Sequence, residues 1–231
     1  MIFLLYDMKA KPKTKQHSFF YKNSLTIVFM LLFILSLLGQ AISGWKDHNE
    51  YLKDKRQTEL SLGEYSMSPH FIQATFENWE SEFLQMALFV VLTIWLKEKG
   101  SSESKPQDGE DEVDKVTKAK SNSPWPVKRG GFILKLYENS LSIALFLLFI
   151  ISFLMHWYGS LKEYNLEQAL ENKPMANAME YLGMPTFWFE SFQNWQSEFL
   201  SIAVIVFLSI YLRQKGSPQS KPVNAGYAED E

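Results

Sequence analysis

The sequence consists of two copies of one unit. Residues 21–25 (YKNSL) return as residues 137–141 (YENSL), and residues 78–84 (NWESEFL) return as residues 194–200 (NWQSEFL). Both pairs are 116 positions apart, and about 35 of the roughly 87 aligned positions from 20 to 106 are identical without any gap. Internal similarity at one fixed offset is the signature of a repeated structural unit. The fold must therefore contain two similar parts.

The first block of each copy predicts a transmembrane helix. Residues 23–45 and 139–161 contain no Asp, Glu, Lys or Arg, although the mean hydropathy of the whole chain is only -0.15. A helix of about 23 residues, rising ~1.5 Å per residue, crosses a hydrocarbon core of roughly 30 Å.

The second block of each copy leaves two alternatives. Residues 83–96 and 199–212 are uncharged over only about 14 residues, which suits a buried helix of a soluble domain as well as a short span. Extending each helix outward through Trp79 and Trp195 gives a full span and places Glu82 and Glu198 in the outer leaflet. We favour this reading, because an even number of spans lets both copies share one orientation. The predicted fold class is an all-α integral membrane protein with four transmembrane helices, arranged as two duplicated hairpins.

The block structure predicts the domain organisation. A cytoplasmic segment (1–19) precedes repeat 1 (20–106, spans about 24–44 and 76–96), a flexible linker (107–131) and repeat 2 (132–222, spans about 140–160 and 192–212). A disordered tail (223–231) follows. The linker is rich in Ser, Lys, Asp, Glu and Pro, a composition typical of solvated tethers. Alternatively, the first span is a cleaved signal sequence ending near residues 39–41, but residues 155–157 of the second copy offer no such cleavage site.

The distribution of positive charge predicts the orientation. The stretches before the first span, between the second and third spans and after the fourth contain about 5, 9 and 3 Lys and Arg residues, against about 4 and 2 in the two remaining loops. Cytoplasmic loops carry the excess of Lys and Arg, so both termini are expected in the cytoplasm of a bacterial cell, with the chain in the inner membrane.

A polar stripe in the second block provides the candidate site. Asn78, Ser81 and Glu82 fall on one helical face at i, i+3 and i+4, and the second copy repeats them. A carboxylate at the membrane centre costs about 2.5 to 3.5 kcal/mol on insertion scales, so the stripe should face protein. Gln40 and His156 lie at a similar depth, so we expect the pairs Gln40–Glu82 and His156–Glu198. The predicted intramembrane layer comprises Gln40, Asn78, Ser81, Glu82, His156, Asn194, Ser197 and Glu198.

Two interpretations of this layer remain open. It locks the helices together, or it forms a proton or cation site or a small polar pocket. The chain has no cysteine, phosphate-binding loop, nucleophile elbow or metal-ligand spacing, so no catalytic, cofactor or metal residue is predicted.

We therefore expect a non-enzymatic structural or interaction module. Its partners would be the lipid bilayer and a homo-oligomer, with no nucleic acid and any small-molecule ligand left open. The alternative is a small proton- or cation-linked transporter or channel subunit that uses Glu82 and Glu198.

Residues 70–85 (HFIQATFENWESEFLQ), the apolar run behind them and the Lys-Gly-Ser-x-x-Ser-Lys ending at 99–105 resemble a family of short bacterial membrane proteins described as a domain of unknown function. The resemblance implies no activity. The second copy departs from the motif with Gln193, Gln196 and Ser201 in place of Glu77, Glu80 and Gln85. Glu82 is shared as Glu198, so we expect these two glutamates to be the residues whose loss matters most.

The predicted topology is testable with reporter fusions. A reporter at Glu231 should be active on the cytoplasmic side, and one inserted between Asn49 and Glu64 should be active outside, because the positive-inside rule places them there. A C-terminal reporter found outside would contradict the assignment.

Overall fold

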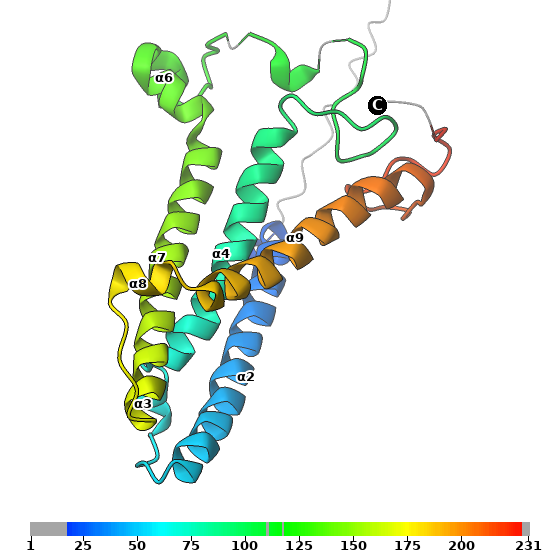
Figure 1. Cartoon of the computed structure of the whole chain (residues 1–231). Coiled ribbons are helices and arrows are strands. Elements are labelled where there is room, and N and C mark those ends of the chain that lie inside the picture. The colour runs from blue at the N-terminus through cyan, green and yellow to red at the C-terminus, as the bar shows by residue number, and fades with distance from the viewer. Residues whose placement is uncertain (1–17, 110, 117, 228–231) are drawn as a thin grey trace, which may run out of the picture.

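The computed structural model describes residues 18–227 except 110 and 117, and this part of the chain is helical with no β-strand. Its long helices are α2 (Ser24–Asp54), α4 (Pro69–Leu92), α7 (Ser140–Leu170) and α9 (Pro185–Tyr211) (Figure 1). Most of the predicted N-terminal segment, 1–19, and the last residues of the predicted tail, 228–231, lie outside the described residues.

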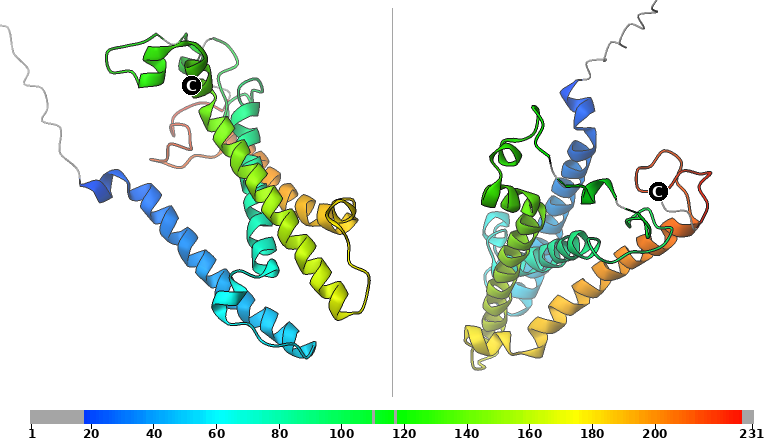
Figure 2. Two further views of the ribbon diagram at one scale, coloured as in Figure 1. Left: turned by 90° about the vertical axis from the view of Figure 1, so that its left-hand side faces the viewer. Right: turned by 90° about the horizontal axis from the view of Figure 1, so that it is seen from above.

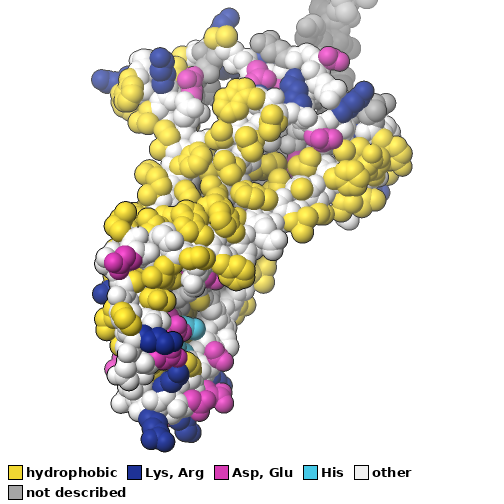
Figure 3. All heavy atoms as spheres, in the orientation of Figure 1, with side chains coloured by type: hydrophobic (Ala, Val, Ile, Leu, Met, Phe, Trp, Pro, Cys, Tyr) yellow, Lys and Arg dark blue, Asp and Glu magenta, His cyan; other side chains and the backbone are white. Residues whose placement is uncertain are grey.

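Three of the described helices, α2, α7 and α9, are long and apolar enough to cross a membrane. On the face drawn in Figure 3, hydrophobic side chains form a band across the middle, and charged side chains gather toward the two ends. Helix α4 is not among the three, and the middle of the helix carries Glu77, Glu80 and Glu82. The chain is therefore an all-α, membrane-embedded protein.

The long helices begin at corresponding positions of the two halves. Helices α2 and α7 begin at Ser24 and Ser140, and α4 and α9 begin at Pro69 and Pro185, each pair 116 residues apart. Proline suits the first turn of a helix, where its missing N–H has no partner to lose, and the prediction that Pro69 and Pro185 open helices is confirmed. Helices α2 and α7 run ten residues past their predicted spans, because no Pro or Gly interrupts residues 45–54 or 161–170.

The loops after α2 and α7 are built alike. The amide of Asn49 bridges the backbone N–H and C=O of Leu60, both at 2.8 Å. Asn165 bridges Ala176 in the same way, at 2.8 and 2.9 Å. Each loop then forms a short helix with a capping box, α3 (Leu62–Tyr65) and α8 (Ala178–Leu182).

The connecting segments gather at the opposite end of the molecule. The linker contains the 3₁₀ turn η1 (Glu112–Asp114) and the helices α5 (Trp125–Arg129) and α6 (Gly131–Glu138), while α1 (Phe19–Lys22) precedes α2. Figures 1 and 2 place the linker at the same end as the C-terminal segment. At this end, a hydrogen bond of 2.8 Å between the hydroxyls of Ser101 and Ser209 joins the segment that follows α4 to α9.

Helix α4 is the centre of the arrangement. It makes the most extensive described helix pair with α7 and a smaller one with α9, whereas α2 meets it at few points and diverges from the rest (Figure 2). Small residues permit the close approach of α4 and α7. A Cβ atom added to Gly159 on α7 would lie 2.6 Å from the backbone N and 3.0 Å from the Cα of Gln73 on α4. Close backbone contact through small residues is how membrane helices commonly associate.

The substitution Gly159→Ala should destabilise the protein, because its methyl group would collide with backbone that cannot rotate away. Overpacking of this kind costs typically about 1 to 3 kcal/mol. The matched control is Gly39→Ala on α2, where a Cβ meets nothing within 4 Å, and this variant should unfold like the parent or slightly later. Thermal unfolding in detergent, followed by circular dichroism, measures both. Parent-like unfolding of the Gly159 variant would mean that the two helices do not approach this closely.

A buried histidine and three glutamates as candidate functional site

One face of α7 is polar although the helix is otherwise apolar. Ser152, His156, Ser160 and Glu163 recur at intervals of three or four residues, and all four are buried. This spacing places them in one stripe along the helix. Because most of the other α7 side chains are apolar, the stripe fixes the rotation of α7, with its polar face against its neighbours and its apolar faces toward lipid.

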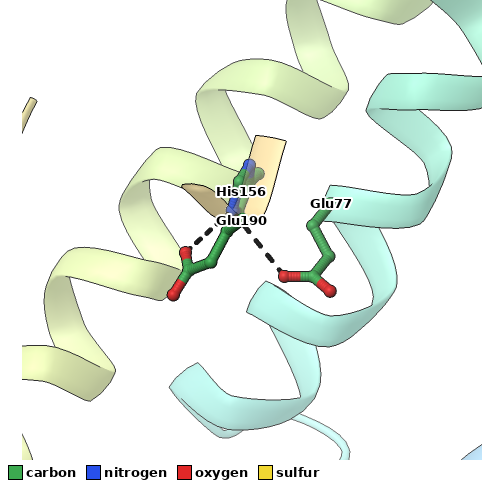
Figure 4. Close-up of side chains that lie close together, drawn as sticks. All are labelled: Glu77, His156 and Glu190. Carbon is green, nitrogen blue, oxygen red and sulfur yellow. Dashed lines mark hydrogen bonds and ion pairs between the residues drawn. The ribbon is translucent and has the colours of Figure 1, made fainter. Parts of the chain in front are cut away.

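His156 is the centre of a cluster formed by three helices. Its ring is completely buried and stacks on Phe187 of α9 with centroids 4.9 Å apart. Its Nδ1 lies 2.7 Å from Oε2 of Glu80 on α4, and its Nε2 lies 3.3 Å from Oε2 of Glu190 on α9. The same Nε2 is 3.9 Å from Oε2 of Glu77. Figure 4 shows the carboxylates of Glu77 and Glu190 approaching this nitrogen from two sides.

Glu80 is the innermost carboxylate. Its side chain is completely buried, and both of its oxygens have partners. Oε2 contacts His156, and Oε1 accepts a hydrogen bond of 2.9 Å from the indole Nε1 of Trp195 on α9. A buried carboxylate without such partners would be strongly unfavourable, so His156 and Trp195 together make its position possible.

Glu190 and Glu77 are the outer carboxylates, with side chains 17% and 18% exposed, so the cluster is partly open on their side. Glu190 accepts hydrogen bonds from the hydroxyl of Ser160 and, at 3.0 Å, from the amide of Gln73. Glu77 accepts a longer one, 3.4 Å, from the amide of Asn194. Every glutamate of the cluster is therefore held by a group from another helix.

The cap of the cluster on the loop side is neutral. Tyr181 of α8 is 1% exposed and lies against Ser160. Burial raises the pKa of Tyr181 to about 12, so its hydroxyl stays protonated at neutral pH and adds no negative charge.

The charges of the cluster do not balance. Three carboxylates surround one imidazole, and their other partners are neutral donors from Ser160, Gln73, Asn194 and Trp195. Within residues 18–227, no Lys or Arg forms an ion pair with any of the three glutamates. Even a protonated His156 leaves an excess of two negative charges at a site shielded from water, which an additional cation or protons would compensate.

A family model described as a domain of unknown function (DUF6766) matches residues 16–230, nearly the whole chain. The chain belongs to this family. No curated protein and no solved structure matches it. The DUF6766 description assigns no activity.

The predicted layer of this DUF6766 protein is only partly brought together. His156 is in the cluster, and Asn194 and Ser81 lie beside it, with Ser81 2% exposed. The expected pairs are not formed, because Gln40 donates to Thr75 and His156 contacts Glu80, Glu77 and Glu190. The remaining members, Asn78, Glu82, Ser197 and Glu198, lie outside the cluster, and Glu82, Asn78 and Ser197 are exposed.

Sequence reasoning missed Glu77, Glu80 and Glu190. It gave weight to residues that the two copies share, whereas the cluster uses residues that they do not share. Position by position, His156 corresponds to Gln40. Glu77 and Glu80 correspond to Gln193 and Gln196, and Glu190 corresponds to Ala74. At all four positions the residue of the cluster is charged or titratable and its counterpart in the other copy is neutral. This difference between the copies could have pointed to the cluster.

The variant His156→Gln should be destabilised by about 3 to 5 kcal/mol, because it leaves the buried carboxylate of Glu80 and the two partly exposed ones beside it with no cationic partner. Adding Glu80→Gln should recover part of this loss, since the pair then becomes two amides, the residue types at the corresponding positions of the other copy, Gln40 and Gln196. The exposed Glu82→Gln is the control and should change stability by less than about 0.5 kcal/mol. Unfolding in detergent measures the stability of the parent and of these three variants. A double variant as unstable as His156→Gln would show that the charge of Glu80 is not coupled to His156.

Proposed function

We propose that this protein is a non-enzymatic, multi-pass protein of the bacterial inner membrane that binds a small cation at the cluster of His156, Glu77, Glu80 and Glu190. In this proposal α4 is the fourth span, the helices form two duplicated hairpins, and both termini are cytoplasmic. The common offset of 116 residues between helix starts and the asymmetry of Lys and Arg between loops support this arrangement. The fourth span is supported by the position of α4 between α7 and α9.

The observation that carries the proposal is the uncompensated negative charge. Three glutamates converge on one buried imidazole, with neutral donors as their only other hydrogen-bond partners in the described part of the chain. Structural ion pairs in membranes usually balance, because unpaired charge in a weakly polar setting is expensive. An excess of carboxylates, two of them partly exposed, is instead the arrangement expected of a site that receives a cation.

The dimensions of the cluster favour an ion over a substrate molecule. The nearest ligand atoms of Glu77, His156 and Glu190 all lie within 4.8 Å of one another, and the imidazole is fully enclosed. Ligand atoms at this spacing could hold one ion. Because the three residues come from α4, α7 and α9, a bound cation would join three helices, which suits a structural or interaction module whose helix arrangement responds to the ion.

A second candidate function is a small proton- or cation-linked transporter or channel subunit. The observation in its favour is that Glu82 of α4 and Glu198 of α9 interact electrostatically with each other, near the cluster. Four helices enclose only a narrow passage, so transport would call for a homo-oligomer. Vesicles reconstituted with the protein distinguish the two, since transport should be lost in Glu82→Gln/Glu198→Gln while cation binding at His156 persists.

Cation binding should appear as stabilisation. Purified protein freed of metal by a chelator should unfold at a higher temperature when one of Na⁺, K⁺, Mg²⁺, Ca²⁺, Mn²⁺ or Zn²⁺ is added at constant ionic strength. A ligand present at 100 times its Kd stabilises the folded state by about 2.7 kcal/mol.

The matched variant is Glu77→Gln/Glu190→Gln, which keeps the side-chain shapes and removes the excess charge. Its response to the cation should be lost, and its unfolding temperature without cation should equal or exceed that of the parent, because the repulsion between carboxylates is gone. An unchanged response in this variant, or no response to any cation in the parent, would refute the proposed site.

A further inference from the structure

We infer that the cation is a divalent transition metal of the zinc class, ligated by Nε2 of His156 and by one carboxylate oxygen each of Glu77 and Glu190. The inference rests on the proposed cation-binding function and specifies its ligand. It follows from the distances between the three ligand atoms, from the hydrogen bonds that hold the ligands, and from the chemical types of the donor atoms.

The geometry fits a common ion. Zinc binds imidazole nitrogen and carboxylate oxygen at about 2.0 to 2.2 Å, so tetrahedral ligand atoms lie roughly 3.4 Å apart. Nε2 of His156 is 3.3 Å from the nearest oxygen of Glu190 and 3.9 Å from that of Glu77. A small rotation of the two partly exposed glutamate side chains would place all three donor atoms at bonding distance from one ion.

The partners of the imidazole prepare Nε2 as a ligand. Nδ1 lies 2.7 Å from the carboxylate of Glu80, so in the neutral ring the proton sits on Nδ1 and the lone pair of Nε2 points at Glu190 and Glu77. In the neutral ring this lone pair faces carboxylate oxygens, and a bound cation or a second ring proton removes the resulting repulsion. A ligating histidine that donates its other N–H to a carboxylate is the usual arrangement of protein metal sites.

The other two ligands are held as well. Ser160 and Gln73 donate to Glu190, and Asn194 donates to Glu77, so each ligand is oriented by an outer hydrogen bond. Trp195 holds Glu80, which in turn holds the imidazole. The site is therefore supported from α4, α7 and α9 at once.

The donor set selects the class of metal. One imidazole nitrogen and two carboxylates, with a fourth position open on the exposed side, suit zinc and neighbouring transition metals. Calcium and magnesium prefer six or more oxygen ligands, which this cluster does not supply. The corresponding positions of the other repeat hold Gln40, Gln193 and Ala74, so each chain should bind a single ion.

The test uses the full chain in detergent, stripped of metal and titrated with Zn²⁺ by calorimetry and with Co²⁺ by visible absorption, which reports the coordination geometry. One ion should bind per chain. Glu190→Gln and Glu77→Gln should each weaken binding by more than tenfold, while circular dichroism confirms that they remain folded. Glu80→Gln, which removes only an outer partner, should weaken binding by about 10- to 100-fold. Glu82→Gln and Glu198→Gln are the controls and should bind like the parent.

Three results would overturn the metal assignment. Undiminished Zn²⁺ binding in Glu190→Gln and Glu77→Gln would place the ion on other carboxylates. Equal affinity for Ca²⁺ or Mg²⁺ would exclude the imidazole as a ligand. Stabilisation by those ions or by monovalent cations, with no effect of Zn²⁺, would reject the zinc class yet leave the proposed cation site standing, whereas the absence of any cation effect on unfolding would reject both.

Discussion

The contact between His156 and Glu80 is the interaction on which the arrangement of the helices depends. Both side chains are completely buried, on helices that present mainly apolar residues to their surroundings. A charged or strongly polar group at this depth is tolerated only when it faces protein partners. That requirement fixes the rotation of α7 about its axis, and with it the position of the whole stripe from Ser152 to Glu163. The close approach at Gly159, one turn away, then brings the helices near enough for a direct hydrogen bond.

The same interaction explains why the two halves of the molecule pack differently. The residues of α2 and α9 that correspond to His156 and Glu80 are Gln40 and Gln196, which are neutral. Among the described residues α2 and α9 form no counterpart of the α4–α7 contact, and Gln40 instead donates to Thr75 within its own hairpin. A neutral amide finds a partner at little cost, so nothing forces α2 against α9. Two halves of similar sequence therefore form one tight helix pair and one open one.

Much of the fold could be read from the sequence, because local signals decide it. The apolar runs, the first-turn prolines Pro69 and Pro185, and the shared Asn49 and Asn165 all mark features that the structure contains. The site was harder, because it depends on which face of α4 turns inward. Glu80 and Glu82 are two residues apart and point to nearly opposite sides of a helix, so periodicity alone does not choose between them. Packing of α4 against α7 buries Glu80 and leaves Glu82 exposed. Glu190 was invisible for another reason, since it lies before the apolar run of its helix and has Ala74 as its counterpart.

The cluster also determines how α9 is attached. In the N-terminal half of α9, three hydrogen bonds join it to α4, namely Gln73 with Glu190, Glu77 with Asn194, and Glu80 with Trp195, and each includes a glutamate of the cluster. At its C-terminal end α9 is joined to the segment after α4 by the hydrogen bond between Ser209 and Ser101. Of these two attachments, only the one at the cluster carries net charge. A change in the charge of the cluster, such as binding of the proposed ion, therefore acts directly on the contact that sets the angle of α9 against α4. In a protein whose α4–α7 pair is fixed by close backbone packing, this is the helix whose position a cation can alter most.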